Sequence, residues 1–205
     1  LVRAWELSEE LELPAAASRA QTIVVTGMGG SATGGDYFAA LAAVSAQVPV
    51  QVVRGYSLPN YVNERSLVIV CSYIGNTEES LSCYDDAWKR GASIIATTKG
   101  GKLGERARAD GASVYPIPYQ AEPRAALAQS LAPLLRIGAR LGLCAVDSAD
   151  IRATAEQHAA LVEGELAIAR ALTGMLIAAA RHLLAPRQIE LFRLTIAEVH
   201  RSPEL

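Results

Sequence analysis

Two segments rich in glycine and hydroxyl residues have the composition of anion-binding loops. Residues 27–36 (GMGGSATGGD) and 71–79 (CSYIGNTEE) each follow an apolar run and lead into a helical pattern. Glycines let backbone N–H groups approach a ligand closely, and hydroxyl groups near a helix N-terminus add hydrogen-bond donors. We therefore expect both segments to hold an anion, with Ser31, Ser72 and Thr77 among the donors.

The elements around these segments predict a common position for them. Short β-branched runs alternate with helical patterns, which is typical of βαβ units and one parallel sheet. Strands are expected at residues 22–26, 48–53, 67–70, 93–97 and 113–117, and helices at 35–46, 78–90 and 102–110. In the flavodoxin-like order 2-1-3-4-5, the carboxyl ends of strands 1 and 3 bracket the switch point where such sheets bind ligands. The two segments follow these strands, so the sequence predicts one site between them.

The alternative is that the glycines and small polar residues only form tight turns and helix caps, with Asn76 or Thr77 as an N-cap. Other phosphate motifs fit the first segment less well. A P-loop needs Gly-Lys-Ser/Thr, and this segment ends in Gly-Gly-Asp. The segment satisfies a loose dinucleotide fingerprint, but the second strand runs into Arg54 rather than an acidic residue. Because Arg54 could accept a 2′-phosphate, an NADP site stays open as an alternative.

Composition restricts the function classes. The 205 residues are 51% hydrophobic and 20% charged, so a folded domain with a substantial core is expected. The net charge of −2 lacks the basic excess of nucleic-acid-binding proteins, and the longest apolar stretch, 166–184, is interrupted by two arginines and a histidine, so neither nucleic acid nor membrane is an expected partner. The three cysteines, Cys71, Cys83 and Cys144, are widely spaced and form no disulfide framework, which indicates a reducing compartment. No signal peptide is visible, so a cytoplasmic location is expected.

The last third of the chain carries only helical patterns. Helices are expected at residues 125–143, with a possible kink at Pro133, and at 151–184 and 188–201. The predicted organisation is therefore an α/β domain of residues 1–145 followed by an all-helical extension of residues 146–205.

Three further motifs accompany the two segments, namely VRGY at 53–56, GGKL at 100–103 and PRAAL at 123–127. In this order the five motifs resemble the bifunctional phosphoglucose/phosphomannose isomerases of the sugar isomerase (SIS) superfamily. These enzymes pair two SIS domains, each a flavodoxin-like sandwich, and interconvert glucose 6-phosphate or mannose 6-phosphate with fructose 6-phosphate. The resemblance implies a five-stranded parallel SIS sandwich and a hexose 6-phosphate substrate, with no metal and no cofactor. A homodimer is expected.

The resemblance also implies roles for individual residues. Gly30 and Ser31 match the first phosphate loop, and Ser72 and Thr77 match the phosphate-holding residues of the second. Arg124 matches the arginine beside the reacting carbons, where a guanidinium could stabilise a cis-enediolate. The alternative for Arg124 is a residue at a helix N-terminus paired with a neighbouring glutamate.

Some residues depart from the family pattern. Ile74 replaces a phosphate-binding serine, and Glu122 replaces the glutamine before the Pro-Arg pair. The family's general base, a glutamate, and its ring-opening histidine belong to the second SIS domain, and neither motif has a match after residue 150. We expect the acidic and histidine side chains there to be solvated or capping groups: His158, Glu163, Glu165 and His182. The catalytic set is thus predicted to be incomplete, and a non-catalytic sugar-phosphate-binding module is an alternative.

The C-terminal residues have a resemblance of their own. Residues 191–205, and in a weaker form about 165–205, are similar to a helix in the ligand-binding and dimerisation domain of tetracycline-repressor-type regulators. Phe192, Ile196 and Val199 share one face that suits docking on a neighbouring helix or subunit. This leaves a helical dimerisation or regulatory fusion as a further alternative.

Overall fold

The computed structural model describes residues 1–118 and 127–162. The chain divides into two compact units, of which the first comprises Leu1 with Arg3–Ala145 and the second comprises Val2 with the chain from Val146 onward. No helix in the described ranges is long and apolar enough to cross a membrane.

One five-stranded parallel sheet forms the centre of the first unit. Its order is β2-β1-β3-β4-β5, with β1 at Thr22–Thr26, β2 at Val50–Val53, β3 at Ser66–Cys71, β4 at Ser93–Thr98 and β5 at Ser113–Pro116. All six residues of β3 are buried, as expected for a parallel strand covered on both faces. The prediction of a five-stranded parallel sheet in flavodoxin-like order is confirmed.

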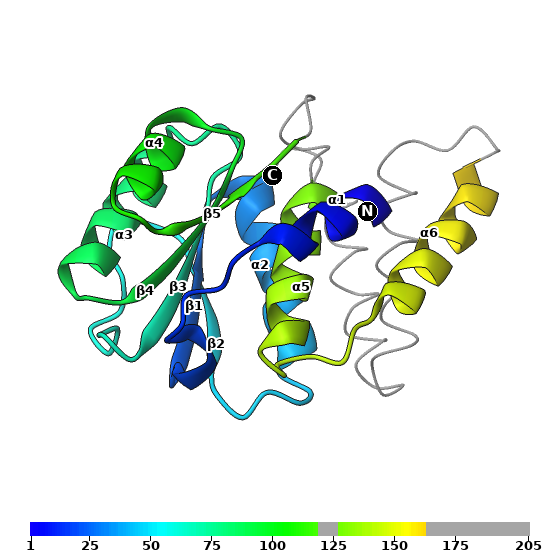
Figure 1. Cartoon of the computed structure of the whole chain (residues 1–205), viewed down its shortest axis with the longest axis horizontal. Coiled ribbons are helices and arrows are strands. Elements are labelled where there is room, and N and C mark those ends of the chain that lie inside the picture. The colour runs from blue at the N-terminus through cyan, green and yellow to red at the C-terminus, as the bar shows by residue number, and fades with distance from the viewer. Residues whose placement is uncertain (119–126, 163–205) are drawn as a thin grey trace, which may run out of the picture. The chain divides into compact units, whose positions relative to one another are not determined.

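Helices cover both faces of this sheet (Figure 1). α3 (Glu78–Lys89) and α4 (Gly101–Ala109) pack against each other on one face, over an apolar cluster that includes Val68, Val70 and Leu103. α2 (Gly29–Ala42) and α5 (Leu127–Arg140) pair on the other. The N-terminal segment holds α1 (Val2–Leu7) and two short 3₁₀ turns, Ser8–Glu10 and Ala17–Arg19.

Several helix boundaries differ from the prediction. α2 begins at Gly29, six residues earlier than expected, so Gly30 and Ser31 lie in its first turn rather than in a loop. α5 spans Leu127–Arg140 with Pro133 inside the helix. The described part of the second unit holds α6, Ser148–Val162. The rest of the helix expected at 151–184, and the one expected at 188–201, lie outside the described residues.

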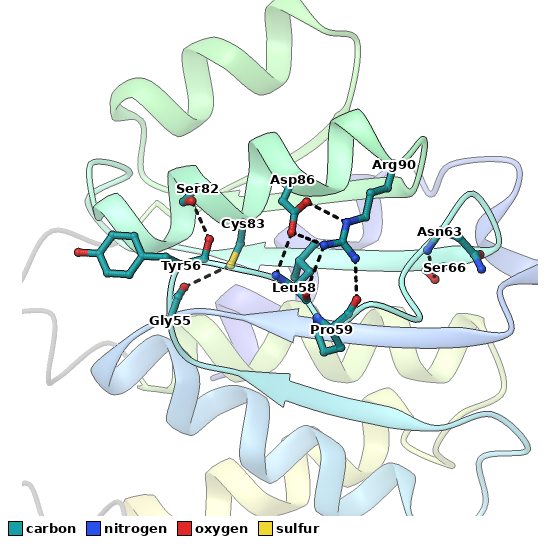
Figure 2. Close-up of polar contacts among 10 residues, drawn as sticks. All are labelled: Gly55, Tyr56, Leu58, Pro59, Asn63, Ser66, Ser82, Cys83, Asp86 and Arg90. Carbon is teal, nitrogen blue, oxygen red and sulfur yellow. Dashed lines mark hydrogen bonds and ion pairs between the residues drawn. The ribbon is translucent and has the colours of Figure 1, made fainter.

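The connection from β2 to β3, residues 54–65, contains no helix. Hydrogen bonds join it to side chains of α3 and to Arg90, the residue after that helix. Figure 2 shows the contacts. The Arg90 guanidinium donates to the Asp86 carboxylate at 2.7 and 2.8 Å and to the Pro59 carbonyl at 2.7 Å, while Asp86 accepts the Leu58 N–H at 3.0 Å. Nearer the start of α3, the Ser82 hydroxyl donates to the Tyr56 carbonyl at 2.6 Å. α3 and the connector therefore form one hydrogen-bonded assembly.

Candidate anion-binding site

The β3–α3 loop, residues 72–77, brings two predicted hydroxyl groups together. The Ser72 backbone N–H donates to the Thr97 carbonyl at 3.0 Å, which extends the strand pairing by one residue. Its Oγ lies 3.1 Å from Thr77 Oγ1 and accepts the Gly75 N–H at 3.1 Å. Thr77 occupies the N-cap position of α3, but its side chain makes no capping hydrogen bond. It pairs with Ser72 instead.

This pairing leaves one hydroxyl proton for a ligand. Each hydroxyl has one proton to donate, and the contact between the two oxygens uses only one of the two protons. Ser72 is 3% exposed, whereas Thr77 is half-buried. The arrangement in which Ser72 donates to Thr77, and Thr77 donates outward, therefore suits an anion placed at the N-terminus of α3.

The second part of the site is the first turn of α2. Gly30 is exposed and Ser31 is half-buried, and the Ser31 N–H donates to the Met28 carbonyl at 3.1 Å. Among the described residues, no hydrogen bond engages the Ser31 hydroxyl. The Thr33 hydroxyl, in contrast, donates back to the Gly29 carbonyl at 3.1 Å, so it is occupied within the helix.

Gly27 brings the two parts together. A Cβ atom at Gly27 would lie 2.8 Å from the Cys71 carbonyl oxygen and 3.2 Å from Ser31 Cβ. Gly27 thus lies against both Cys71, which precedes Ser72, and the first turn of α2, at the carboxyl ends of the neighbouring strands β1 and β3. Both helices direct their N-termini, with unpaired backbone N–H groups and positive dipole ends, to this edge. The two segments therefore lie together at the edge of the sheet where the sequence predicts a site.

Charged groups surround the site. Glu78 and Glu79 lie in the first turn of α3, and the Tyr56 hydroxyl lies 3.3 Å from a Glu78 carboxylate oxygen. The pKa of Tyr56 is raised by the charge of Glu79, by burial, and by the charge and hydrogen bond of Glu78. Lys99 and Lys102, both exposed, belong to the adjacent β4–α4 turn.

The remaining predicted residues have other environments. Arg54 forms an ion pair with Asp36 of α2, so its guanidinium already faces a carboxylate, which does not favour a 2′-phosphate there. Burial raises the pKa of the Cys71 thiol, directly before Ser72, to about 11, which keeps it protonated at neutral pH. Arg124 and Glu122 lie outside the described residues. Within residues 1–118 and 127–162, no three His, Cys, Asp or Glu side chains form a group that could hold a metal ion.

Asn76 has a role that the sequence did not reveal. Its Oδ1 accepts the N–H of Lys102 at 3.0 Å, so it caps α4 and not α3. Ile74, in the same loop, is 57% exposed. Its side chain therefore contributes little to the core, and the family difference at this position concerns the surface of the loop.

Comparison with known proteins identifies the relatives of this chain. The bifunctional phosphoglucose/phosphomannose isomerase of Caldicellulosiruptor bescii is 46% identical over 141 residues, which are 69% of this chain and 42% of that protein. Over those residues the chain is a relative of the bifunctional phosphoglucose/phosphomannose isomerases. Other curated relatives carry the same name at 32–40% identity, so the family predicted from the five motifs is confirmed. No protein-family model matches the chain.

The match has a clear limit, because the chain spans only 34–42% of the length of these relatives. Solved structures agree on the fold. A hypothetical protein of Thermus thermophilus superposes with a TM-score of 0.58 at 20% identity, covering 88% of this chain and 44% of that one. A Salmonella typhimurium protein assigned as a phosphosugar isomerase gives 0.50 at 22% identity, covering 68% and 48%. The α/β sandwich fold is thereby confirmed. The residues that resemble tetracycline-repressor-type regulators, about 165–205, lie outside the described ranges.

Proposed function

We propose that residues 1–145 are a SIS domain that binds a hexose 6-phosphate through its phosphate and serves aldose–ketose isomerisation between glucose 6-phosphate or mannose 6-phosphate and fructose 6-phosphate. The observation that carries this proposal is the Ser72–Thr77 hydroxyl pair beside the first turn of α2. Gly30 and Ser31 of that turn complete the phosphate-binding set. A homodimer in the cytoplasm remains a prediction.

The proposed chemistry is opening of the sugar ring followed by proton transfer between C1 and C2 through an enediol. The phosphate subsite anchors the substrate. Its hydroxyl and backbone N–H groups stabilise the phosphate dianion by donating hydrogen bonds, without a lysine. Arg124 is proposed to stabilise the enediolate. It precedes Leu127, the first residue of α5, by three positions, and Ser130 of α5 lies against Gly34 of α2, 3.3 Å from a Cβ built there.

The general base and the ring-opening acid are not assigned. The family's motifs for them have no match after residue 150, and the chain spans less than half of each curated relative. A second candidate function follows from this observation: a sugar-phosphate-binding module without catalytic activity of its own.

Calorimetry with fructose 6-phosphate, together with a coupled assay for glucose 6-phosphate formation, separates these functions. Binding with turnover supports an isomerase, and binding without turnover supports the module. Absence of binding refutes both. The remaining alternative, a helical dimerisation element, predicts that deletion of residues 188–205 halves the mass measured by light scattering.

Three substitutions test the placement of the phosphate. Thr77→Val removes the hydroxyl that donates to the phosphate, and Ser72→Ala removes the partner that orients this hydroxyl. Each should weaken binding at least tenfold, because a hydrogen bond to a charged ligand contributes about 1.5–3 kcal/mol. Ser45→Ala is the matched control, since the Ser45 hydroxyl donates to the Leu143 carbonyl beyond the opposite end of α2. It should leave affinity unchanged. Ile74→Ser restores a hydroxyl at an exposed position and should tighten binding by about tenfold or more.

A further inference from the structure

The β3–α3 loop is joined to the β4–α4 turn, residues 98–102, by a series of hydrogen bonds. The Lys99 N–H donates to the Tyr73 carbonyl at 2.9 Å, and the Leu103 N–H donates to the Gly75 carbonyl at 2.9 Å. The turn is itself held by the Thr98 hydroxyl, which donates to the Gly100 carbonyl at 2.9 Å. The loop that carries Ser72 and Thr77 therefore rests on a neighbouring turn along most of its length.

Asn76 adds a side-chain link between the two segments. The N-cap residue of α4 is Gly100, which has no side chain with which to cap the helix. Asn76 Oδ1 supplies the missing acceptor by binding the Lys102 N–H, across 26 positions in sequence. The β3–α3 loop thus supplies a hydrogen-bond acceptor for a backbone N–H group in the first turn of α4, and this hydrogen bond in turn holds the loop in position.

The segments are in such close contact that only glycines fit between them. A Cβ atom on Gly75, which has φ +80°, would overlap the Gly100 carbonyl oxygen. A Cβ atom on Gly101, with φ +63°, would lie 2.5 Å from the Ile74 carbonyl oxygen and 2.8 Å from Asn76 Oδ1. Neither position tolerates a side chain unless the loop moves.

We infer that the β4–α4 turn holds the phosphate-binding loop in its binding geometry, and that Asn76 is the positioning residue that joins them. Gly75 transmits this constraint, because its carbonyl accepts the Leu103 N–H while its own N–H donates to Ser72 Oγ. The first turn of α4 is therefore two hydrogen bonds from the hydroxyl pair. This inference rests on the proposed phosphate site at Ser72 and Thr77.

Two variants change the support without removing any proposed phosphate ligand. Asn76→Ala removes the side-chain link, and Gly101→Ala places a methyl group against the loop backbone. Each should weaken the binding of fructose 6-phosphate and of inorganic phosphate by the same factor, about three- to tenfold, because the loss is confined to the phosphate subsite.

Each variant has a matched control. Asn63 Oδ1 accepts the Arg65 N–H at 2.9 Å in the β2–β3 connector, so Asn63→Ala removes an equivalent link elsewhere. Gly111 has φ +70°, and a Cβ atom at this position would have no neighbour within 4 Å. Gly111→Ala therefore introduces the same backbone strain as Gly101→Ala but no clash with a neighbouring segment. Both controls should bind phosphate like the parent chain.

The outcomes are distinguishable. If Ser72→Ala and Thr77→Val weaken binding at least tenfold but Asn76→Ala and Gly101→Ala leave it unchanged, the inference is wrong and the proposed function stands. If Ser72→Ala and Thr77→Val have no effect, the proposed function itself fails. In Asn76→Ala, the Lys102 amide hydrogen should exchange faster with solvent, because its acceptor is lost. Asn76→Asp keeps an acceptor oxygen at this position, so the exchange of the Lys102 amide should return to the slower rate of the parent chain. Unchanged exchange of that amide in Asn76→Ala would also overturn the inference.

Discussion

The two segments of the proposed phosphate site use glycine for different purposes. In the first, Gly27, Gly34 and Gly35 have ordinary backbone angles, and a Cβ at each would contact a neighbouring element within 3.3 Å. In the second, Gly75 combines a positive φ with contact against the β4–α4 turn. The first segment is thus positioned by the packing of α2 on the sheet and on α5, and the second by a hydrogen-bonded turn.

Their hydroxyl groups differ in the same way. No hydrogen bond to a described residue engages the Ser31 hydroxyl, whereas Ser72 binds both Gly75 and Thr77. The second segment therefore has its donors in place before a ligand arrives, and the first offers an additional donor on a rigid helix. Preorganised donors lose less entropy on binding, so the second segment should contribute more of the affinity.

The largest predicted effect comes from placing the same methyl group in each segment. Gly75→Ala should lower the free energy of unfolding by more than about 3 kcal/mol, because the strain of a left-handed residue, about 1–2 kcal/mol, adds to a clash with a backbone carbonyl that cannot rotate away. Gly29 also has a positive φ, +50°, but nothing lies within 4 Å of a Cβ built there. Gly29→Ala should cost only the strain. Urea unfolding measures both, and equal losses would contradict the distinction between the segments.

Much of this fold could be predicted from the sequence. Five β-branched runs at regular spacing fix a parallel sheet, and flavodoxin-like order then places the segments after β1 and β3 at one edge. The start of α2 could not be predicted, because glycines at positions 29, 30, 34 and 35 have low helix propensity. Tertiary contact overrides that propensity: Gly35 lies against Val25, and only glycine allows α2 to approach β1 so closely.

The site was predictable to a similar extent. Ser72 and Thr77 were identified because a strand, a short loop and a helix N-terminus bring hydroxyls five residues apart to the same edge. Of the two candidates for the N-cap of α3, Thr77 occupies that position, whereas Asn76 caps α4. Local spacing could not predict the contact of Asn76, because its partner lies 26 residues away. The general base has no local pattern in this sequence that distinguishes it from a solvated glutamate.

The packing role of glycine in the first segment is tested by Gly35→Ala. A Cβ there would lie 2.9 Å from Val25 Cγ1, so we expect a loss of about 1–3 kcal/mol despite the better helix propensity of alanine. Val25→Ala makes room for the methyl group. The double variant should therefore be more stable than the sum of the single losses by about 1 kcal/mol. Strict additivity in thermal or urea unfolding would show that α2 is not held by this contact.

Ser72 and Ser31 should differ in their contributions to stability, although both belong to the proposed phosphate site. Ser72→Ala leaves the Gly75 N–H without its acceptor in a buried loop and should cost about 1–2 kcal/mol of unfolding free energy. Ser31→Ala changes a half-buried residue in the first turn of α2 and should alter stability by less than about 0.5 kcal/mol. Both should weaken phosphate binding. A stability loss in Ser31→Ala as large as that in Ser72→Ala would indicate that the first segment is also held by its hydroxyl.

The smallest expected effect on the free energy of unfolding concerns the β2–β3 connector, residues 54–65, which contacts both α2 and α3. On α2 it forms the half-exposed Arg54–Asp36 pair, and on α3 it forms the Asp86 network of Figure 2. Burial by itself would raise the pKa of Asp86, but the Leu58 N–H and the Arg90 guanidinium outweigh it and lower the pKa below its usual 3.8.

A carboxyl group with a lowered folded-state pKa contributes stability above its unfolded-state pKa and loses that contribution as the pH falls through the folded-state value. Asp86→Asn should therefore be less stable than the parent chain at pH 7, and the difference should shrink below about pH 4. Asp36→Asn is the control, because an exposed ion pair contributes about 0–1 kcal/mol and is screened by salt. Urea unfolding at a series of pH values from about pH 2.5 to about pH 7 measures both variants. A difference for Asp86→Asn that is independent of pH would mean that α3 is held to the connector by Arg90 and its carbonyl partners alone.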